Sequence, residues 1–104
     1  MSRIYSVSEI ASIVTPVAES YDIVKIALFG SVARGEATAE SDIDLVVDRG
    51  DSLKTKGIYF FGFCLALEEA LGKKADIVSY SGLEHSFLKK YIDKDEVVIY
   101  ERQR

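Results

Sequence analysis

Two short apolar segments, each bordered by small or acidic residues, constrain the fold of this chain more than any other feature. The first, Ile23–Phe29, is rich in β-branched residues and stops at Gly30-Ser31. The second covers residues 43–47 and begins inside the Ser-Asp-Ile-Asp run of residues 41–44. Runs of this length and composition, bounded by turn residues, predict buried β-strands. We therefore expect a sheet in which one strand ends at a Gly-Ser bend and the next begins with two aspartates.

Helical and strand patterns alternate along the rest of the chain. Ser6 and Glu9 form a capping-box pattern before the first helix, Pro16 is expected to kink or divide that helix, and Gly72 is a typical helix stop. The order of elements predicts an α/β fold, a small mixed β-sheet flanked by helices, in a single domain over residues 1–104. The expected helical segments are 7–21, 31–35, 57–71 and 83–92, the further strands are 75–80 and 96–100, and residues 51–56 are expected to be a polar loop.

Composition excludes several classes of protein. With 104 residues, 48% of them hydrophobic, the chain can build one core without disulfides. Its single cysteine, Cys64, excludes an internal disulfide and a multi-cysteine zinc site. No apolar run is long enough to span a bilayer, and the N-terminus does not resemble a signal peptide, so we expect no membrane association and a cytoplasmic location. The net charge of −4 argues against stable nucleic-acid binding.

The acidic residues at the start of the second strand predict a metal site. Residues two apart on a strand point to the same face, so Asp42 and Asp44 present two carboxylates side by side. Two such charges repel each other unless a cation lies between them, and Mg²⁺ prefers carboxylate and phosphate oxygens. Asp76 lies near the start of the third expected strand, as its second residue. If that strand neighbours the second, Asp76 completes the site and can help to deprotonate an acceptor hydroxyl.

The Gly30-Ser31 bend predicts a phosphate site beside these carboxylates. Glycine lets the backbone approach a ligand closely, and Ser31 begins a helical turn whose free N–H groups favour an anion. A phosphate cradle next to metal-holding carboxylates is what nucleotidyl transfer requires, because two metal ions can activate the attacking oxygen and stabilise the departing pyrophosphate.

The complete pattern resembles a known family. Gly30-Ser31, ten intervening residues and then Asp42-x-Asp44 is similar to the signature of the DNA polymerase β-type nucleotidyltransferase superfamily. The longer pattern, residues 28–35 with residues 41–45, resembles its minimal members, the MNT proteins, over nearly the whole chain. The resemblance implies a polymerase β palm-like fold. It also implies phosphate binding by Gly30 and Ser31 and metal binding by Asp42, Asp44 and Asp76.

The same resemblance implies a specific reaction and partner. MNT proteins are often paired with a HEPN-domain toxin and act as its antitoxin, so we expect two Mg²⁺ ions, ATP as the nucleoside triphosphate, and transfer of AMP to a hydroxyl, expected to be a tyrosine, of a HEPN partner in a hetero-complex. Two alternatives stay open. The chain could neutralise its partner by contact alone, or it could modify a small molecule or RNA. The short chain disfavours the last alternative, since it leaves no room for a second domain to hold such an acceptor.

Several residues can also be explained by structural roles that involve no ligand. Arg34 could contact the triphosphate or could pair with Glu36 or Glu40, and the sequence favours neither. Asp42 could cap a turn with the help of Ser41. His85 is expected on the surface. Cys64 is expected to be a small core residue. The cluster of Phe60, Phe61 and Phe63 is expected to serve core and partner surface rather than to stack on a base.

Overall fold

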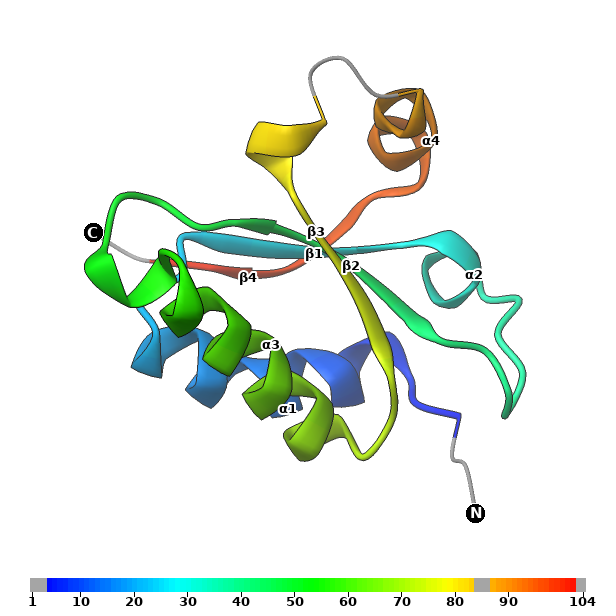
Figure 1. Cartoon of the computed structure of the whole chain (residues 1–104). Helices are drawn as coiled ribbons and strands as arrows, with labels where there is room; N and C mark the ends of the chain where they lie inside the picture. The colour runs from blue at the N-terminus through cyan, green and yellow to red at the C-terminus, as the bar shows by residue number, and fades with distance from the viewer. Residues whose placement is uncertain (1–3, 84–86, 103–104) are drawn as a thin grey trace.

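A mixed four-stranded sheet in the order β3-β2-β1-β4 organises the chain (Figure 1). The structure is a computed structural model, and it describes residues 4–83 and 87–102 of the chain. Strand β1 pairs antiparallel with both β2 and β4, whereas β2 and β3 run parallel. The strands are β1 (Lys25–Phe29), β2 (Ile43–Asp48), β3 (Ala75–Ser79) and β4 (Val97–Glu101). The helices are α1 (Val7–Ser20), α2 (Gly30–Ala33), α3 (Ile58–Leu71) and α4 (Leu88–Asp95), with 3-10 turns η1 (Leu53–Thr55) and η2 (Tyr80–Gly82).

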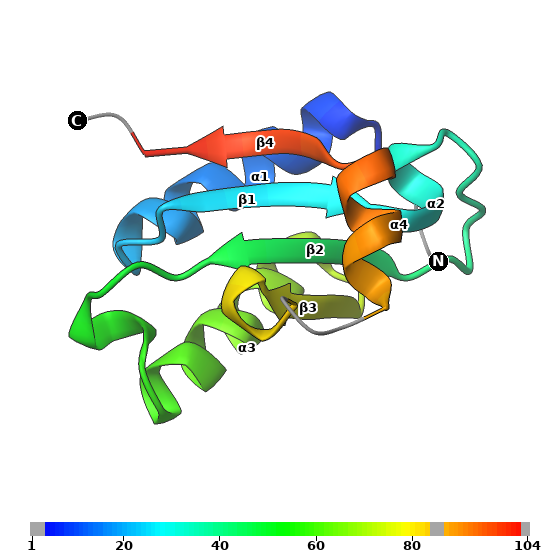
Figure 2. The ribbon, with the colours of Figure 1, turned by 90° about the horizontal axis from the view of Figure 1, so that it is seen from above.

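The two faces of the sheet are covered unequally. Helices α1 and α3 lie side by side on one face, whereas η2 and α4 cover part of the other (Figures 1 and 2). The larger core fills the space between the sheet and the α1–α3 pair, and it includes Ile43 and Leu45 of β2. Val46 of β2 belongs to a smaller cluster with Leu83 and Ile92 on the other face. Because strand side chains alternate, Asp44 lies on the same face as Val46, where the cover is incomplete.

Local signals explain the ends of the two long helices. The capping box is confirmed, since the Ser6 side chain accepts from the Glu9 N–H at 3.1 Å and the Glu9 carboxylate accepts from the Ser6 N–H at 3.0 Å. Gly72 caps α3 in the left-handed conformation at φ +67°. Helix α1 continues through Pro16 and is not divided. Pro16 is exposed on α1, so the carbonyl that loses its helical partner there can bond to water.

Other boundaries differ from the prediction. Strand β1 begins at Lys25 rather than Ile23, because Ile23 leaves α1 through a turn and its N–H bonds to the Ala18 carbonyl. Residues 53–55 of the expected loop form η1, whose Thr55 is buried. Helix α4 extends to Asp95, and His85 lies outside the described residues. Within residues 4–83 and 87–102, no helix is both long enough and apolar enough to cross a bilayer.

Candidate active site

The sheet register brings two of the expected acidic residues, Asp44 and Asp76, into one line with the end of β1. Phe29 at the end of β1 is the antiparallel partner of Asp44, and Asp44 is the parallel partner of Asp76 on β3. Asp44 and Asp76 therefore stand on the same face of adjacent strands. This register confirms the expectation that the second and third strands lie next to each other. Sequence periodicity alone could not establish it, because the pairing joins residues separated by helix α3.

Gly30 places the backbone directly against the Asp44 carboxylate. The residue adopts φ +73°, and a Cβ added there would lie 3.1 Å from Asp44 Cγ and closer still to Oδ2. Both the left-handed backbone and the close approach require glycine at this position. The Gly-Ser bend and the Asp44 carboxylate therefore form one continuous surface.

The bend continues into a single turn of helix. Helix α2 has four residues, begins at Gly30 and has no side-chain cap. The first N–H groups of a helix have no partner within it, so this turn can offer N–H donors to an anion. With only one turn, the macrodipole contributes little, and the donor groups with the Ser31 hydroxyl would carry the attraction.

The loop before Asp42 is fixed by Ser41 rather than by Asp42. The Ser41 hydroxyl accepts from the Thr38 N–H at 2.9 Å, and the Ser41 N–H donates to the Thr38 carbonyl at 3.1 Å. Asp42 is exposed and immediately precedes β2. The turn-capping role considered for Asp42 therefore belongs to Ser41, and the Asp42 carboxylate is left facing solvent next to the site.

Asp44 is the electrostatic centre of the site. Its pKa is raised from 3.8 to about 6, first by burial, then by the negative charge of Asp76 and a hydrogen bond with the Asp76 carboxyl, and then by the charge of Asp42. Arg34 acts in the opposite direction and lowers the pKa of Asp44. The site is thus short of positive charge.

This electrostatic strain predicts that Asp44→Asn stabilises the metal-free protein above pH 6. A raised pKa in the folded state means that ionised Asp44 opposes folding, so stability falls as the pH rises from 3.8 through about 6. We expect the variant to be more stable than wild type by about 1–2 kcal/mol at neutral pH, after discounting for solvent screening. Thermal unfolding in a chelator should show this advantage shrinking towards pH 4. An equal difference at all pH values would contradict it.

Arg34 is held beside the site by two carboxylates. Its Nη1 donates to Asp95 of α4 at 3.0 Å and its Nε donates to Glu36 at 3.3 Å, and these hydrogen bonds raise its pKa. The pairing with Glu36, one of the alternatives left open for Arg34, is present, whereas the contact with Asp95, 61 residues away, was not predicted. No local pattern in the sequence connects two residues so far apart. Because the guanidinium is exposed, it can exchange these partners for a phosphate.

The carboxylates suit a hard divalent cation in combination with a phosphate ligand. Within the part of the chain that the structure describes, no three His, Cys, Asp or Glu side chains are already gathered as metal ligands. The expected convergence of three acids is therefore not found as a preformed set among the described residues: Asp44 and Asp76 are paired in register, whereas Asp42, two residues before Asp44, is exposed. Mg²⁺ commonly takes one or two carboxylates and completes its shell with water and substrate phosphates. The partly buried Asp44 and the exposed Asp76, paired beside a bend with N–H donors, fit that mode.

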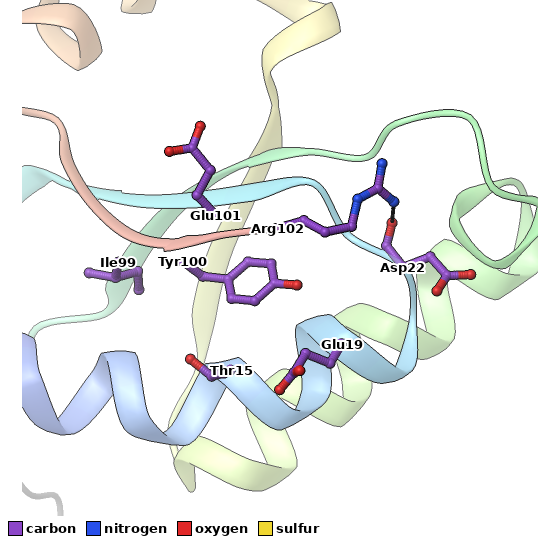
Figure 3. Close-up of a pocket in the computed structure, with 7 residues that line it drawn as sticks. All are labelled: Thr15, Glu19, Asp22, Ile99, Tyr100, Glu101 and Arg102. Carbon is purple, nitrogen blue, oxygen red and sulfur yellow. Dashed lines mark hydrogen bonds between the residues drawn. The ribbon is translucent and has the colours of Figure 1, made fainter. Parts of the chain in front are cut away.

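A separate hollow lies at the opposite end of β1 from these carboxylates. About 540 Å³ in volume, it opens between α1 and β4, with the Tyr100 ring directed into it above Glu19 (Figure 3). Arg102 closes one end through a 3.4 Å hydrogen bond from its guanidinium to the Asp22 carbonyl. Tyr100 is next to Ile26 in the β1–β4 register, whereas the Gly-Ser bend follows Phe29. The two sites are therefore distinct, and the hollow lacks the paired carboxylates.

Comparison with known proteins agrees with this geometry. Residues 12–104 match the family model described as polymerase beta, nucleotidyltransferase. The chain is 35% identical over 81 residues to a candidate protein adenylyltransferase of Methanocaldococcus jannaschii, covering 78% of this chain and 81% of that protein. It is 33% identical over 88 residues to the protein adenylyltransferase MntA of Thermococcus cleftensis, covering 81% and 87%.

A solved structure shares the fold. The chain aligns with a TM-score of 0.64 and 20% identity to a chain in the structure of a tri-AMPylated Shewanella oneidensis HEPN toxin in complex with MNT antitoxin. The alignment covers 90% of this chain and 71% of that one. The predicted small mixed sheet with flanking helices, in a nucleotidyltransferase fold, is thereby confirmed.

Proposed function

The chain belongs to the polymerase beta nucleotidyltransferase family, and from this membership we propose that it transfers AMP from ATP to a hydroxyl of a partner protein. The observation that carries the proposal is the Asp44–Asp76 pair standing in register beside the left-handed Gly30. Relatives named as protein adenylyltransferases support AMP as the transferred group and a protein as the acceptor. The reaction would take place in the cytoplasm, where ATP is available.

We place the triphosphate on the Gly30-Ser31 bend. The N–H groups of the bend and the Ser31 hydroxyl would bind phosphate oxygens, and Arg34 would leave Asp95 to contact the same phosphates. Asp42, Asp44 and Asp76 would hold Mg²⁺, expected as two ions. When bound, the metal would neutralise the triphosphate and favour ionisation of the acceptor hydroxyl.

In the proposed step, the acceptor oxygen forms a bond to the α-phosphorus of ATP. The bond from that phosphorus to the α,β-bridging oxygen breaks, and pyrophosphate leaves with the electron pair. Asp76 is exposed at the edge of the site and would accept the proton of the acceptor hydroxyl. Asp44 is partly buried and its carboxylate lies against the Gly30 backbone, so it would position the reacting groups.

The proposed acceptor is a tyrosine of a HEPN toxin, and the chain would act as the antitoxin. The shared fold with a chain from an MNT–HEPN complex supports this pairing. The exposed site also supports a macromolecular acceptor, because Asp42 and Asp76 both face solvent.

Incubation with α-labelled ATP, Mg²⁺ and a HEPN-domain toxin tests the proposal. We expect label on the HEPN protein, together with loss of its toxicity. Peptide mapping should locate the label on a tyrosine. If the toxin is neutralised without any label, the chain acts by contact alone. If label appears only on RNA or on a small molecule, the proposed acceptor is wrong.

A further inference from the structure

Helix α3 is apolar on two opposite sides. Phe63, Leu67 and Leu71 face the core and are fully buried. On the other side, Ile58, Phe61 and Leu65 are 79%, 62% and 51% exposed. Their spacing of three and four residues places them in one stripe along the helix. A helix with apolar residues around its circumference is ordinarily buried on both sides, so this stripe is an unpartnered face.

The stripe continues into a hollow at the start of the helix. Leu53 of η1 is 77% exposed and Tyr59 is 61% exposed, and both lie beside Ile58. Together with Gly57 they line a hollow of about 640 Å³. A contiguous apolar surface with a depression at one end is characteristic of a protein interface rather than of free surface.

Opposite charges without intramolecular partners mark the two ends of the stripe. Lys56 precedes the helix, and Glu69 lies on the same side as Leu65, four residues further along. Across residues 4–83 and 87–102, neither side chain forms an ion pair, whereas the neighbouring Lys54 is within 3.8 Å of Asp22. The stripe thus has a positive end and a negative end. If a second copy of the stripe runs in the opposite direction, the positive end of each copy lies against the negative end of the other.

We propose that this face, defined by Leu53, Ile58, Phe61 and Leu65, binds the same face of a second copy of the chain, with the two α3 helices antiparallel about a two-fold axis near Phe61. Such an interface is self-complementary, as a two-fold requires. Leu65 lies four residues after Phe61 and Gly57 lies four residues before it. At about 1.5 Å per residue, each Leu65 then meets the hollow of the other copy.

The charges fit the same arrangement. Glu69 lies about 12 Å beyond Phe61 along the helix axis. Lys56 is on the other side of Phe61, and its flexible side chain can extend beyond the end of the helix. The antiparallel pairing therefore places each Glu69 near Lys56 of the other copy, and both ion pairs lie at the rim, where they set the direction of pairing more than its strength.

The proposed interface leaves both active sites open. Turn η1 and the start of α3 lie at the end of the sheet opposite α2 and the Gly-Ser bend (Figures 1 and 2). The dimer is consequently independent of AMP transfer, and failure of one proposal does not decide the other.

Sedimentation equilibrium over a wide concentration range tests the dimer. We expect wild type to dimerise, and Leu65→Asp to raise the dissociation constant at least about a hundredfold, because it places a charge against the apolar hollow. Val98→Asp is the matched control, since Val98 is 47% exposed on β4, away from this face. It should leave the dimer intact. Circular dichroism confirms folding, and Leu65→Ser provides a milder variant if Leu65→Asp does not fold.

Charge reversal tests the direction of pairing. Lys56→Glu and Glu69→Lys should each weaken the dimer several-fold, and the double variant should restore it. A double variant weaker than both single variants would contradict the antiparallel arrangement. The proposal of a second copy is overturned if wild type is monomeric at all concentrations. If, in that case, Leu65→Asp loses binding to the acceptor protein, the face binds the acceptor instead. Labelling of the acceptor by Leu65→Asp reports separately on the proposed function.

Discussion

Asp44→Asn is expected to lower the rate of AMP transfer at least about a hundredfold, because it removes the carboxylate on which the site is centred. Asp44 is paired with Asp76 in the β2–β3 register and lies against the Gly30 backbone, so its carboxylate is the one placed between the second acid and the bend. Asparagine keeps the shape of the residue but loses the charge. The loss should appear in kcat measured with labelled ATP and a fixed amount of acceptor, while the metal-free protein becomes more stable.

Asp48→Asn is the matched control for this prediction. Asp48 ends the same strand, lies four residues from Asp44 and accepts a 3.1 Å hydrogen bond from the Gly50 N–H. Its replacement makes the same change of charge away from the bend and should reduce the rate by no more than a few-fold. Equal losses in the two variants would mean that the net charge of the strand matters, and that Asp44 has no particular role.

Gly30→Ala is expected to remove activity and to destabilise the fold. An alanine at φ +73° is strained by about 1–2 kcal/mol. Its Cβ would also overlap the Asp44 carboxylate, so either the bend or the carboxylate must move. Because reacting groups must be held within fractions of an ångström, we expect a loss of transfer of about a hundredfold or more. Chemical denaturation and single-turnover labelling measure the two effects separately.

Gly72→Ala separates backbone strain from steric overlap. Gly72 has φ +67°, and a Cβ there would have no atom within 4 Å. This variant should show the loss of stability due to the left-handed backbone and retain transfer. If Gly30→Ala is no more damaging than Gly72→Ala in both measurements, close packing of the bend against Asp44 is not required for function.

Sequence alone predicted the parts of the structure that depend on short-range signals. The Ser6–Glu9 capping box and the Gly72 stop are local patterns with a direct physical cause, and both are present. The two buried strands were predicted because apolar runs bounded by turn residues have few alternatives. That β2 and β3 are neighbours could only be assumed from the sequence, since strand pairing depends on the whole sheet.

The remaining features depend on contacts between distant residues. Asp95 reaches Arg34 only because α4 folds back over the sheet. The exposed face of α3 could not be separated from its core face by composition, because both are apolar. Phe63 is buried and Phe61 is exposed, but the expectation that this cluster serves core and partner surface does not say which residue takes which place. Cys64 is partly buried and packs against the core as expected.

A crystal structure with Mn²⁺ and a non-hydrolysable ATP analogue tests the proposed site most sharply, because the anomalous signal of manganese locates the ion without reference to any assumed chemistry. We expect a manganese peak between the carboxylates of Asp44 and Asp76, with the triphosphate against the Gly30-Ser31 bend. A nucleotide seated elsewhere, for example in the hollow beside Tyr100, or manganese bound away from this carboxylate pair, would contradict the account.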